Sequence, residues 1–331
     1  SRLDLLVASM GKHIGVLINQ GKGQFIDQSA DSGIKTGFAA TSMALSDVDH
    51  DGDLDLYVCN YGLISVLKSG GKVSWKMRNG KPVATGRHAK RIKFLDGIMV
   101  EYGEPDHFYL NDGNGKFTPV DWQDGTFVNE DGQALETIEW FQGLAVAFRD
   151  YNQDGWPDIY ICNDGFMPDR MWLNRGNGTF QATPPLTLRK TSYTSMGVDF
   201  ADINRDGFDD FFVADMLASS HEKKLTQAML DQLGQPEDIG DYLSRPQYRR
   251  NTLFVNRGDH TFAETAFHAG VAATDWTWSV VFMDADLDGW EDLFITNGFP
   301  VDGEDKDAGE YSRLMQTKVR NWRGLSLDQQ P

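Results

Sequence analysis

The stretch DVDHDGDLDLYVCN at residues 47–60 decides the fold, because its pattern returns three more times along the chain. The copies are DYNQDGWPDIYICN at 150–163, DINRDGFDDFFVAD at 202–215 and DADLDGWEDLFITN at 284–297. The chain opens with SRLDLLVAS, which is the later part of the same frame. Such recurrence indicates a repeat architecture in which each copy belongs to one structural unit.

A second pattern, Asn-x-Gly-x-Gly-x-Phe, accompanies these frames and is typical of a β-hairpin turn. From its Asn to the next acidic frame the chain runs 28 residues in three cases and 39 in the fourth. The uninterrupted unit from 150 to 202 is 52 residues long, which suits a four-stranded propeller blade. The hairpin Asn residues are Asn19, Asn111, Asn174 and Asn256.

Hydrophobic periodicity around the acidic frames predicts strands. SMALSD, AVAFRD, GVDFAD and SVVFMD alternate small or polar with apolar residues before each frame, and LYV, IYI, FFV and LFI follow it as continuous apolar runs. We therefore predict an all-β chain, a β-propeller of four-stranded blades. About four and a half blades are visible, and because propellers usually close with more, we expect other sequence to complete the ring.

The blades are expected to occupy residues 1–302, with two insertions between second and third strands. The insertion at 61–106 carries nine Lys or Arg between Lys68 and Lys93, and the insertion at 216–250 contains the helix-compatible stretch SSHEKKLTQAMLDQLG. Helical insertions were therefore expected. A polar tail at 303–331 is compatible with a short helix or a further insertion.

The acidic frames have the pattern Asp-x-Asp/Asn-x-Asp-Gly-x-x-Asp, which predicts calcium sites. Ca²⁺ prefers about six to eight oxygen ligands, and side chains at alternate positions of a tight loop converge on one ion. Positions one, three, five and nine would give side-chain oxygens, Gly at six permits the turn, and position seven offers its backbone carbonyl. In loop 1 (47–55) and loop 2 (150–158) the predicted ligands are Asp47, Asp49, Asp51, Asp53, Asp55, Asp150, Asn152, Asp154, Trp156 and Asp158. In loop 3 (202–210) and loop 4 (284–292) they are Asp202, Asn204, Asp206, Phe208, Asp210, Asp284, Asp286, Asp288, Trp290 and Asp292.

Two alternatives to structural Ca²⁺ sites are disfavoured. An EF-hand needs a bidentate Glu at position twelve and flanking helices, whereas here position twelve is Val or Ile inside a strand. Mg²⁺ tolerates such a flexible site poorly. We expect about four Ca²⁺ ions that couple blade folding to binding, because close carboxylates repel one another in an empty loop.

Charge and cysteine content narrow the function classes. The formal net charge of −18 disfavours nucleic acid and anionic lipid as partners. No apolar run is long enough for a membrane span. Cys59 and Cys162 occupy the same position in two repeats, so a disulfide between them is not expected.

These frames, the hairpin turns and their order resemble FG-GAP/VCBS repeats over almost the whole chain, and integrin α-subunit propellers use similar repeats. GEPDHFYLNDGNGKF and the stretch from RRNTLFVNRGDHTF onward look closest to bacterial secreted proteins of the VCBS and ASPIC/UnbV kind. The resemblance implies a propeller of about seven or eight blades, extracellular or periplasmic, with calcium in its loops and no established catalytic residues.

A ligand face is expected opposite the calcium loops, where the insertions leave the blades. Aromatic rings beside amides suit sugar or peptide binding, and the alternative is that the amides cap strand ends while the rings pack between blades. The basic insertion could dock an acidic partner or anionic polysaccharide. The candidate residues are Asn60, Asn163, Asp215, Asn297, Trp140, Tyr193, Trp276, Trp278, Lys90, Arg91 and Lys93.

Three function classes remain open from the sequence. The first is a secreted binding or scaffolding module for a protein partner, with cell adhesion among its possible roles. The second is a glycan-binding module. The third, which the sequence favours least, is a polysaccharide-degrading enzyme with Asp or Glu plus a basic residue on the insertion face. The sequence contains no GxSxG, P-loop or CxxC motif.

Overall fold

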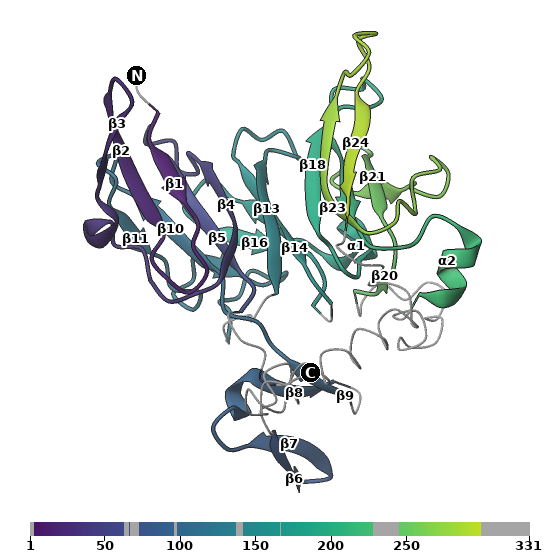
Figure 1. Ribbon diagram of the computed structural model, residues 1–331, viewed down its shortest axis with the longest axis horizontal. Helices are drawn as coiled ribbons and strands as arrows, with labels where there is room; N and C mark the ends of the chain where they lie inside the picture. Colours follow the sequence, from purple (N-terminus) through teal and green to yellow (C-terminus); the bar gives the residue numbers. More distant parts are fainter. Residues whose placement is uncertain are drawn as a thin grey trace, which may run out of the picture.

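The computed structural model describes residues 3–62, 66, 73–95, 98–136, 142–165, 167–227 and 245–298. These residues form antiparallel sheets arranged side by side (Figure 1). Within each complete sheet the strands follow one another outward in chain order, apart from an added parallel strand in one sheet. This is the strand order of propeller blades, and it confirms the all-β prediction.

Three sheets are complete blades. Blade 1 contains β4 (Ala40–Ser46), β5 (Asp55–Asn60), β10 (His107–Asn111) and β11 (Phe117–Pro119). Blade 2 contains β13 (Gly143–Arg149), β14 (Asp158–Asn163), β15 (Arg170–Asn174) and β16 (Phe180–Ala182), and β12 (Phe127–Val128) adds in parallel to β16. Blade 3 contains β18 (Gly197–Ala201), β19 (Asp210–Ala214), β21 (Thr252–Asn256) and β22 (Phe262–Glu264).

Two partial sheets flank these blades. The N-terminal sheet has β1 (Leu5–Val7), β2 (Gly15–Gly21) and β3 (Gln24–Asp27), which correspond to second, third and fourth strands. The C-terminal hairpin has β23 (Thr277–Met283) and β24 (Asp292–Asn297), a first and a second strand. The strand inventory predicted from the repeats is therefore confirmed within the described residues.

The first strands line up in chain order. β4 packs beside β13, β13 beside β18, and β18 beside β23, so successive sheets radiate from a shared inner row (Figure 1). Small residues permit this approach: a Cβ added to Gly143 of β13 would lie 3.0 Å from the Asp106 carboxylate oxygens and from Cys59 Cβ. The crowding explains why the inner strands carry small side chains.

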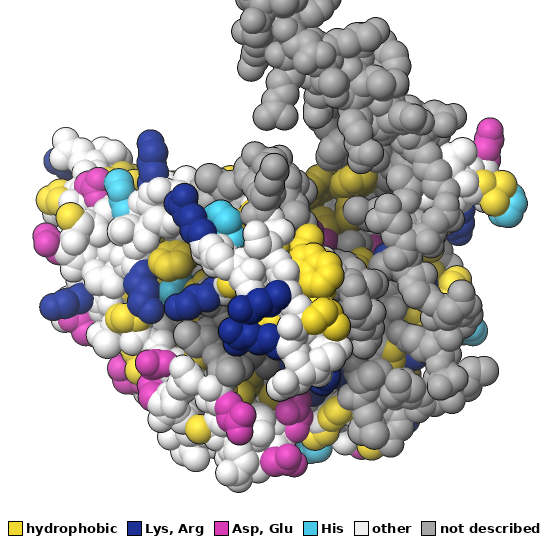
Figure 2. Space-filling model, turned by 90° about the horizontal axis from the view of Figure 1, so that it is seen from below, with side chains coloured by type: hydrophobic (Ala, Val, Ile, Leu, Met, Phe, Trp, Pro, Cys, Tyr) yellow, Lys and Arg dark blue, Asp and Glu magenta, His cyan; other side chains and the backbone are white. Residues whose placement is uncertain are grey.

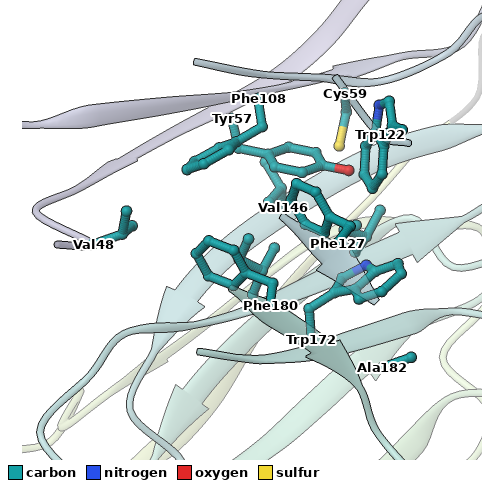
Figure 3. Packing of buried hydrophobic residues seen from close by; sticks show 12 residues of the cluster. Val48, Tyr57, Cys59, Phe108, Trp122, Phe127, Val146, Trp172, Phe180 and Ala182 are labelled. Carbon is teal, nitrogen blue, oxygen red and sulfur yellow. The ribbon is translucent and has the colours of Figure 1, made fainter. Parts of the chain in front are cut away.

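The core lies between blades rather than within one layer. β5, β14 and β19 are buried along their whole length, as the continuous apolar runs predicted. Between blades 1 and 2, Phe108 meets Phe180 edge-on with ring centroids 5.4 Å apart, and Phe127 stacks on Phe180 at 5.2 Å (Figure 3). Each fully buried aromatic side chain contributes about 2–3 kcal/mol of transfer free energy, so the interfaces between blades hold much of the stability.

A buried polar pair recurs where the second and third strands meet. In blade 1 the Asp106 carboxylate accepts from the Tyr57 hydroxyl at 3.1 Å and from the Asn60 amide N–H at 2.7 Å. In blade 2, Asp169 accepts from Tyr160 and Asn163 in the same way. Blade 3 replaces the pair with Phe212 and Asn251, whose amide oxygen accepts from the Asp215 N–H at 2.7 Å. The carboxylate is thus present only where a tyrosine hydroxyl supplies a second donor. Burial raises the pKa of both Asp106 and Asp169 to about 7.

The first insertion corrects one expectation, because its described part is β-structure rather than helix. β6 (Ser74–Arg78) pairs with β7 (Lys81–Thr85), and β8 (Ile92–Leu95) pairs with β9 (Ile98–Glu101). Alternating residues such as Trp75, Met77 and Val83 favour strands, and positive φ at Asn79 (49°) and Gly80 (75°) makes the tight hairpin turn. A short 3₁₀ turn, η2 (Ala89–Arg91), leads into β8.

The second insertion begins with a helix, as expected, within the part that the structure describes. α2 (His221–Thr226) is capped by the Ser220 hydroxyl, which accepts from the Lys223 N–H. The remainder of the helix-compatible stretch falls at 228–234, outside the described residues, as does the tail at 303–331. β20 (Gln247–Tyr248) ends the insertion and pairs in parallel with β17 (Thr191–Ser192).

Both insertions lie on one face of the array, below the blades in Figure 1, while the loops that join first and second strands lie on the opposite face. Two other short elements complete the described chain, η1 (Ser29–Asp31) and α1 (Pro185–Leu188). In the part of the chain that is described, no helix is long and apolar enough to cross a membrane. Cys59 and Cys162 are buried and not bonded to each other.

Candidate metal centres

The four acidic loops share one backbone conformation. In loop 1, His50 at position four and Gly52 at position six have φ of 60° and 95°. The same two positions are left-handed in the other loops. They are Gln153, Gly155, Arg205, Gly207, Leu287 and Gly289. Glycine relieves the strain at position six, whereas position four adopts the left-handed region with a full side chain. These two reversals curl each loop so that alternate side chains face its centre.

Backbone N–H groups hold the carboxylates in that curl. The position-one carboxylate accepts from the N–H of position six in every loop, at 2.8–3.2 Å. The position-five carboxylate accepts from the N–H of position seven, at 2.8–3.1 Å. The position-three oxygen accepts from the N–H of position five, at 2.9–3.3 Å. Each of these side chains is therefore aimed inward by one or two backbone amides and keeps further lone pairs for a cation.

In loops 1 to 3 the position-nine carboxylate ties the loop to the third strand of its blade. Asp158 accepts from the Asn174 N–H at 2.8 Å, and its other oxygen accepts from the Tyr151 N–H at 3.3 Å. Asp55 accepts from the N–H groups of Asn111 and Val48 in the same way, and Asp210 accepts from the Asn256 N–H at 2.8 Å. Desolvation raises the pKa of Asp55 and Asp210 to about 6 and that of Asp158 to about 8. A buried carboxylate of this kind is stabilised by a bound cation.

The residues present fit a hard divalent cation. Carboxylate oxygens of Asp47, Asp49 and Asp51 lie within 4.8 Å of one another, and those of Asp284, Asp286 and Asp292 do so as well. In loop 1 the buried oxygens Asp47 Oδ1 and Asp53 Oδ1 have no hydrogen-bond partner. Desolvation, together with Asp51, Asp49, Asp47 and Asp112 nearby, raises the pKa of Asp53. Unpartnered oxygens amid mutual repulsion are the condition that Ca²⁺ relieves.

Loops 2 and 3 differ from loops 1 and 4 in one ligand. Their position three is Asn, and its Nδ2 donates to the position-five carboxylate, at 3.0 Å from Asn152 to Asp154 and at 2.9 Å from Asn204 to Asp206. This bond neutralises part of the repulsion without an ion. Loops 1 and 4 have Asp at that position and have no such internal donor, so they carry more uncompensated negative charge.

The opposite face contains the predicted ligand residues, and three of them are not accessible. Asn60, Asn163 and Asp215 are at most 2% exposed. Asn60 and Asn163 donate to the carbonyls of Pro105 and Pro168, and Asp215 accepts from the hydroxyls of Ser192 and Thr194. Their interpretation as ligand contacts is corrected: these side chains are buried at the strand ends and bond to the adjoining loops, so they act as caps.

The aromatic candidates are distributed unevenly over this face. Trp276 and Trp278 lie with ring centroids 6.2 Å apart, Trp278 is 44% exposed, and Asn297 next to them is exposed. Tyr193 is half-buried under the Arg249 guanidinium, 4.5 Å from the ring centroid, and does not join that group. Trp140 lies outside the described residues.

The basic candidates belong to the first insertion. Lys90 is exposed, Arg91 pairs with Glu101 at 3.2 Å, and the Lys93 ammonium lies 5.0 Å from the centroid of the Tyr102 ring. Figure 2 views this face from below and shows Lys and Arg side chains gathered beside exposed apolar ones. The structure thus places the basic residues near exposed apolar surface.

Comparison with known proteins identifies the repeat. A protein-family model described as FG-GAP-like repeat matches residues 1–58, 150–213 and 239–295, which together make up more than half of the chain. The chain belongs to the FG-GAP-like repeat family. Each matched segment ends inside the second strand that follows an acidic loop, so the family match includes all four acidic loops.

Similarity to individual proteins is local. Over 82 residues, 22% of this chain and 8% of the relative, the FG-GAP-like chain is 30% identical to integrin alpha-3 of Mus musculus. The chain therefore spans a small part of that relative's length. A solved Agrocybe aegerita lectin, described as recognising non-reducing terminal N-acetylglucosamine, aligns over 89% of this chain and 85% of its own at 14% identity. Its TM-score of 0.21 is too low to carry an argument.

Sequence reasoning missed two sets of residues in these FG-GAP-like repeats. One is position four of each loop, which adopts the left-handed conformation and projects from the curl. The other is the hairpin Asn, which was interpreted as a turn residue although Asn174 and Asn256 also bind the neighbouring blade. The recurrence of this Asn in every copy was the available signal.

Proposed function

We propose that this chain is part of an extracellular or periplasmic, calcium-stabilised β-propeller that binds a protein partner through the face bearing the insertions. The FG-GAP-like repeats and the local likeness to integrin alpha-3 support a propeller module of this kind. The observation that carries the binding role is the β6–β7 hairpin, which presents an exposed apolar and basic surface.

The hairpin surface has the composition of a protein interface. Every residue of β6 is exposed; Trp75 and Met77 are 55% and 58% exposed and alternate with Lys76 and Arg78. Tryptophan, Met and Arg are the residues enriched in interface centres. The Trp75 ring meets Phe94 edge-on at 5.9 Å, which fixes the hairpin against its neighbour β8–β9. We infer an acidic protein partner, because nine Lys or Arg lie between Lys68 and Lys93.

The role proposed for calcium is structural, with about four ions, one in each loop. Each loop joins the innermost strand of a sheet to the second strand and, through position nine, reaches the third strand in blades 1 to 3. An ion that gathers positions one, three, five and nine would therefore bind three strands of one blade together. Removing it would leave several carboxylates in mutual repulsion, next to the buried position-nine carboxylates of loops 1 to 3.

A glycan-binding module is the second candidate, and the exposed Trp278 ring beside Asn297, with the partly buried Trp276 ring 6.2 Å away, favours it. Aromatic faces stack on sugar rings, and a neighbouring amide gives directional bonds. A glycan array with the calcium-loaded protein separates the candidates. Binding that is lost in Trp278→Ala and retained in Trp75→Ala would favour the glycan module.

The test of partner binding uses the hairpin. The calcium-loaded protein carrying a photocrosslinker at Lys76 should capture a specific protein from the exterior of its host cell. The double variant Trp75→Ala/Met77→Ala should then reduce the affinity for that protein by at least about tenfold, as expected for truncating interface anchors. Leu287→Ala is the control, because Leu287 is 87% exposed on the calcium-loop face. Equal affinity of the double variant and the wild type would contradict the proposed surface.

A further inference from the structure

The acidic loops contact one another across the blades, always in the same direction. The side chain at position four of one loop reaches position six or seven of the next loop. His50 of loop 1 stacks on Trp156 of loop 2, with ring centroids 4.0 Å apart and planes 12° apart. Gln153 of loop 2 donates to the carbonyl of Gly207 in loop 3. The Arg205 guanidinium of loop 3 lies 4.0 Å from the centroid of the Trp290 ring in loop 4.

A second set of bonds links the same loops. Asn174 Nδ2 donates to the carbonyl of Val48, position two of loop 1, at 2.8 Å, while the Asn174 N–H donates to Asp158, position nine of loop 2. Asn256 makes the same two bonds between loops 2 and 3. Its Nδ2 donates to the Tyr151 carbonyl at 3.0 Å, and its N–H donates to Asp210. Asn174 and Asn256 thus each hold the backbone of one loop and a proposed ligand of the next.

We propose that these contacts couple the calcium sites, so that occupation of one loop raises the calcium affinity of the next. This inference rests on the proposed calcium sites. His50 and Arg205 act as positioning residues: each lies between the ligands at positions three and five of its own loop and contacts position seven of its neighbour, the position whose carbonyl is offered to the ion.

The physical reason is the conformation at position four. A residue with a Cβ is strained in the left-handed region, where φ is about 60° in all four loops, and the contacts of the closed loop must offset this strain. An ion that closes one loop fixes this residue and presents its side chain to the next loop. Because coupling is reciprocal, an ion in the second loop stabilises the first to the same extent.

The chain contains a matched control. Leu287 is position four of loop 4, with φ of 64° and 87% of its surface exposed. It has the same backbone conformation as His50 and Arg205 but packs on no described loop. Asn tolerates the left-handed conformation, so His50→Asn, Arg205→Asn and Leu287→Asn each remove a side chain while keeping the turn.

The experiment reads individual sites with Tb³⁺. Loops 2 and 4 contain Trp156 and Trp290 at position seven, so their bound Tb³⁺ is sensitised by tryptophan, and Trp156→Phe or Trp290→Phe assigns each signal. Calcium titrations that displace Tb³⁺ then give the affinity of each of these two loops. Calorimetric calcium titration and the melting temperature in excess chelator are recorded in parallel.

The coupling predicts effects that cross from one loop to the next. His50→Asn should weaken loop 2, and Arg205→Asn should weaken loop 4, by about three- to tenfold, which corresponds to loss of one stacking or cation–π contact. Leu287→Asn should leave loop 2 unchanged. Disabling loop 1 with Asp51→Ala should weaken loop 2 in the wild type and have little further effect in His50→Asn.

The outcomes separate this inference from the proposed function. If no loop bound calcium, both the coupling and the proposed calcium-stabilised propeller would be overturned. Calcium binding with independent sites, and with loop 2 unaffected by His50→Asn, would overturn the coupling alone. A purely structural role for His50 would lower the melting temperature in chelator without changing the affinity of loop 2, and this result would also overturn the coupling.

Discussion

The buried pair formed by Tyr57 and Asp106 gives a prediction in which pH sets the size of the effect. Tyr57→Phe deletes a hydroxyl that donates to Asp106 at 3.1 Å, while the Asn60 N–H at 2.7 Å remains. Leaving a buried acceptor under-satisfied costs about 1–3 kcal/mol, and more when the acceptor is charged. The cost should therefore depend on the charge of Asp106.

The sign follows from the pKa. Burial raises the pKa of Asp106 to about 7, above its ordinary value of 3.8, so the folded protein binds a proton that the unfolded chain has lost between about pH 4 and pH 7. Stability contributed by this group falls as pH rises through that window. At pH 5 the folded carboxyl is neutral and Tyr57→Phe should cost about 1 kcal/mol or less. At pH 8 it is charged and the cost should reach about 2–3 kcal/mol.

Blade 3 suggests the compensating change. There Phe212 and Asn251 replace the pair, and an amide brings no charge that needs the hydroxyl. Asp106→Asn in the Tyr57→Phe background should recover most of the loss at pH 8. In blade 2, Asp169 also accepts from the Ser195 hydroxyl at 2.8 Å, so Tyr160→Phe should cost less than Tyr57→Phe.

The assay is urea unfolding at pH 5 and pH 8 in saturating calcium, with the wild type at each pH as reference so that pH effects on the metal loops cancel. A cost of Tyr57→Phe that is equal at the two pH values would refute the reasoning. So would a double variant no more stable than the single one at pH 8.

Three other predictions concern packing and charge. Gly143→Ala should destabilise the protein by about 1–3 kcal/mol in thermal unfolding, because the new Cβ would lie 3.0 Å from Asp106 and Cys59. Gly37→Ala is the comparison for backbone strain alone, because its Cβ would meet no atom within 4 Å although its φ is 89°. Arg250→Ala should lower the free energy of unfolding by about 3–5 kcal/mol, because Glu264 would stay at a buried site without its guanidinium partner. Arg149→Ala should lower it by about 1 kcal/mol or less, because the pair of Arg149 with Asp209 is partly exposed. Similar urea midpoints for the two variants would contradict this difference. Loop 4, with Asp at position three, should bind calcium more tightly than loop 2, and Asp286→Asn should reduce that difference in Tb³⁺ displacement titrations; tighter binding at loop 2 would count against the charge argument.

The strands were predictable because their signals are local. The alternation in SMALSD and AVAFRD reappears as β4 and β13, and the apolar runs LYV and IYI reappear inside the buried strands β5 and β14. Turn chemistry was local as well, since Gly113 and Gly115 have the positive φ that the hairpin pattern requires.

What sequence reasoning lacked were contacts between blades. Asn60 and Asn163 were expected at the surface, but both are buried and donate to the carbonyls of Pro105 and Pro168, and no local pattern encodes that. The partnership of His50 with Trp156 joins residues of separate repeats, so neither loop signals it alone. The first insertion was misjudged because its short apolar alternation around Trp75 was not weighed as strand. The resemblance to VCBS and ASPIC/UnbV proteins stays a prediction. The number of blades in the ring is a prediction as well.

The central claim is that the four acidic loops each hold one calcium ion and thereby fasten the strands of the propeller. Equilibrium dialysis against calcium followed by metal analysis, with crystals of the same sample examined for anomalous scattering, tests it most directly. We expect about four ions per chain, each among positions one, three, five and nine of a loop. Loops without bound metal at saturating calcium, or ions bound elsewhere on the protein, would contradict it.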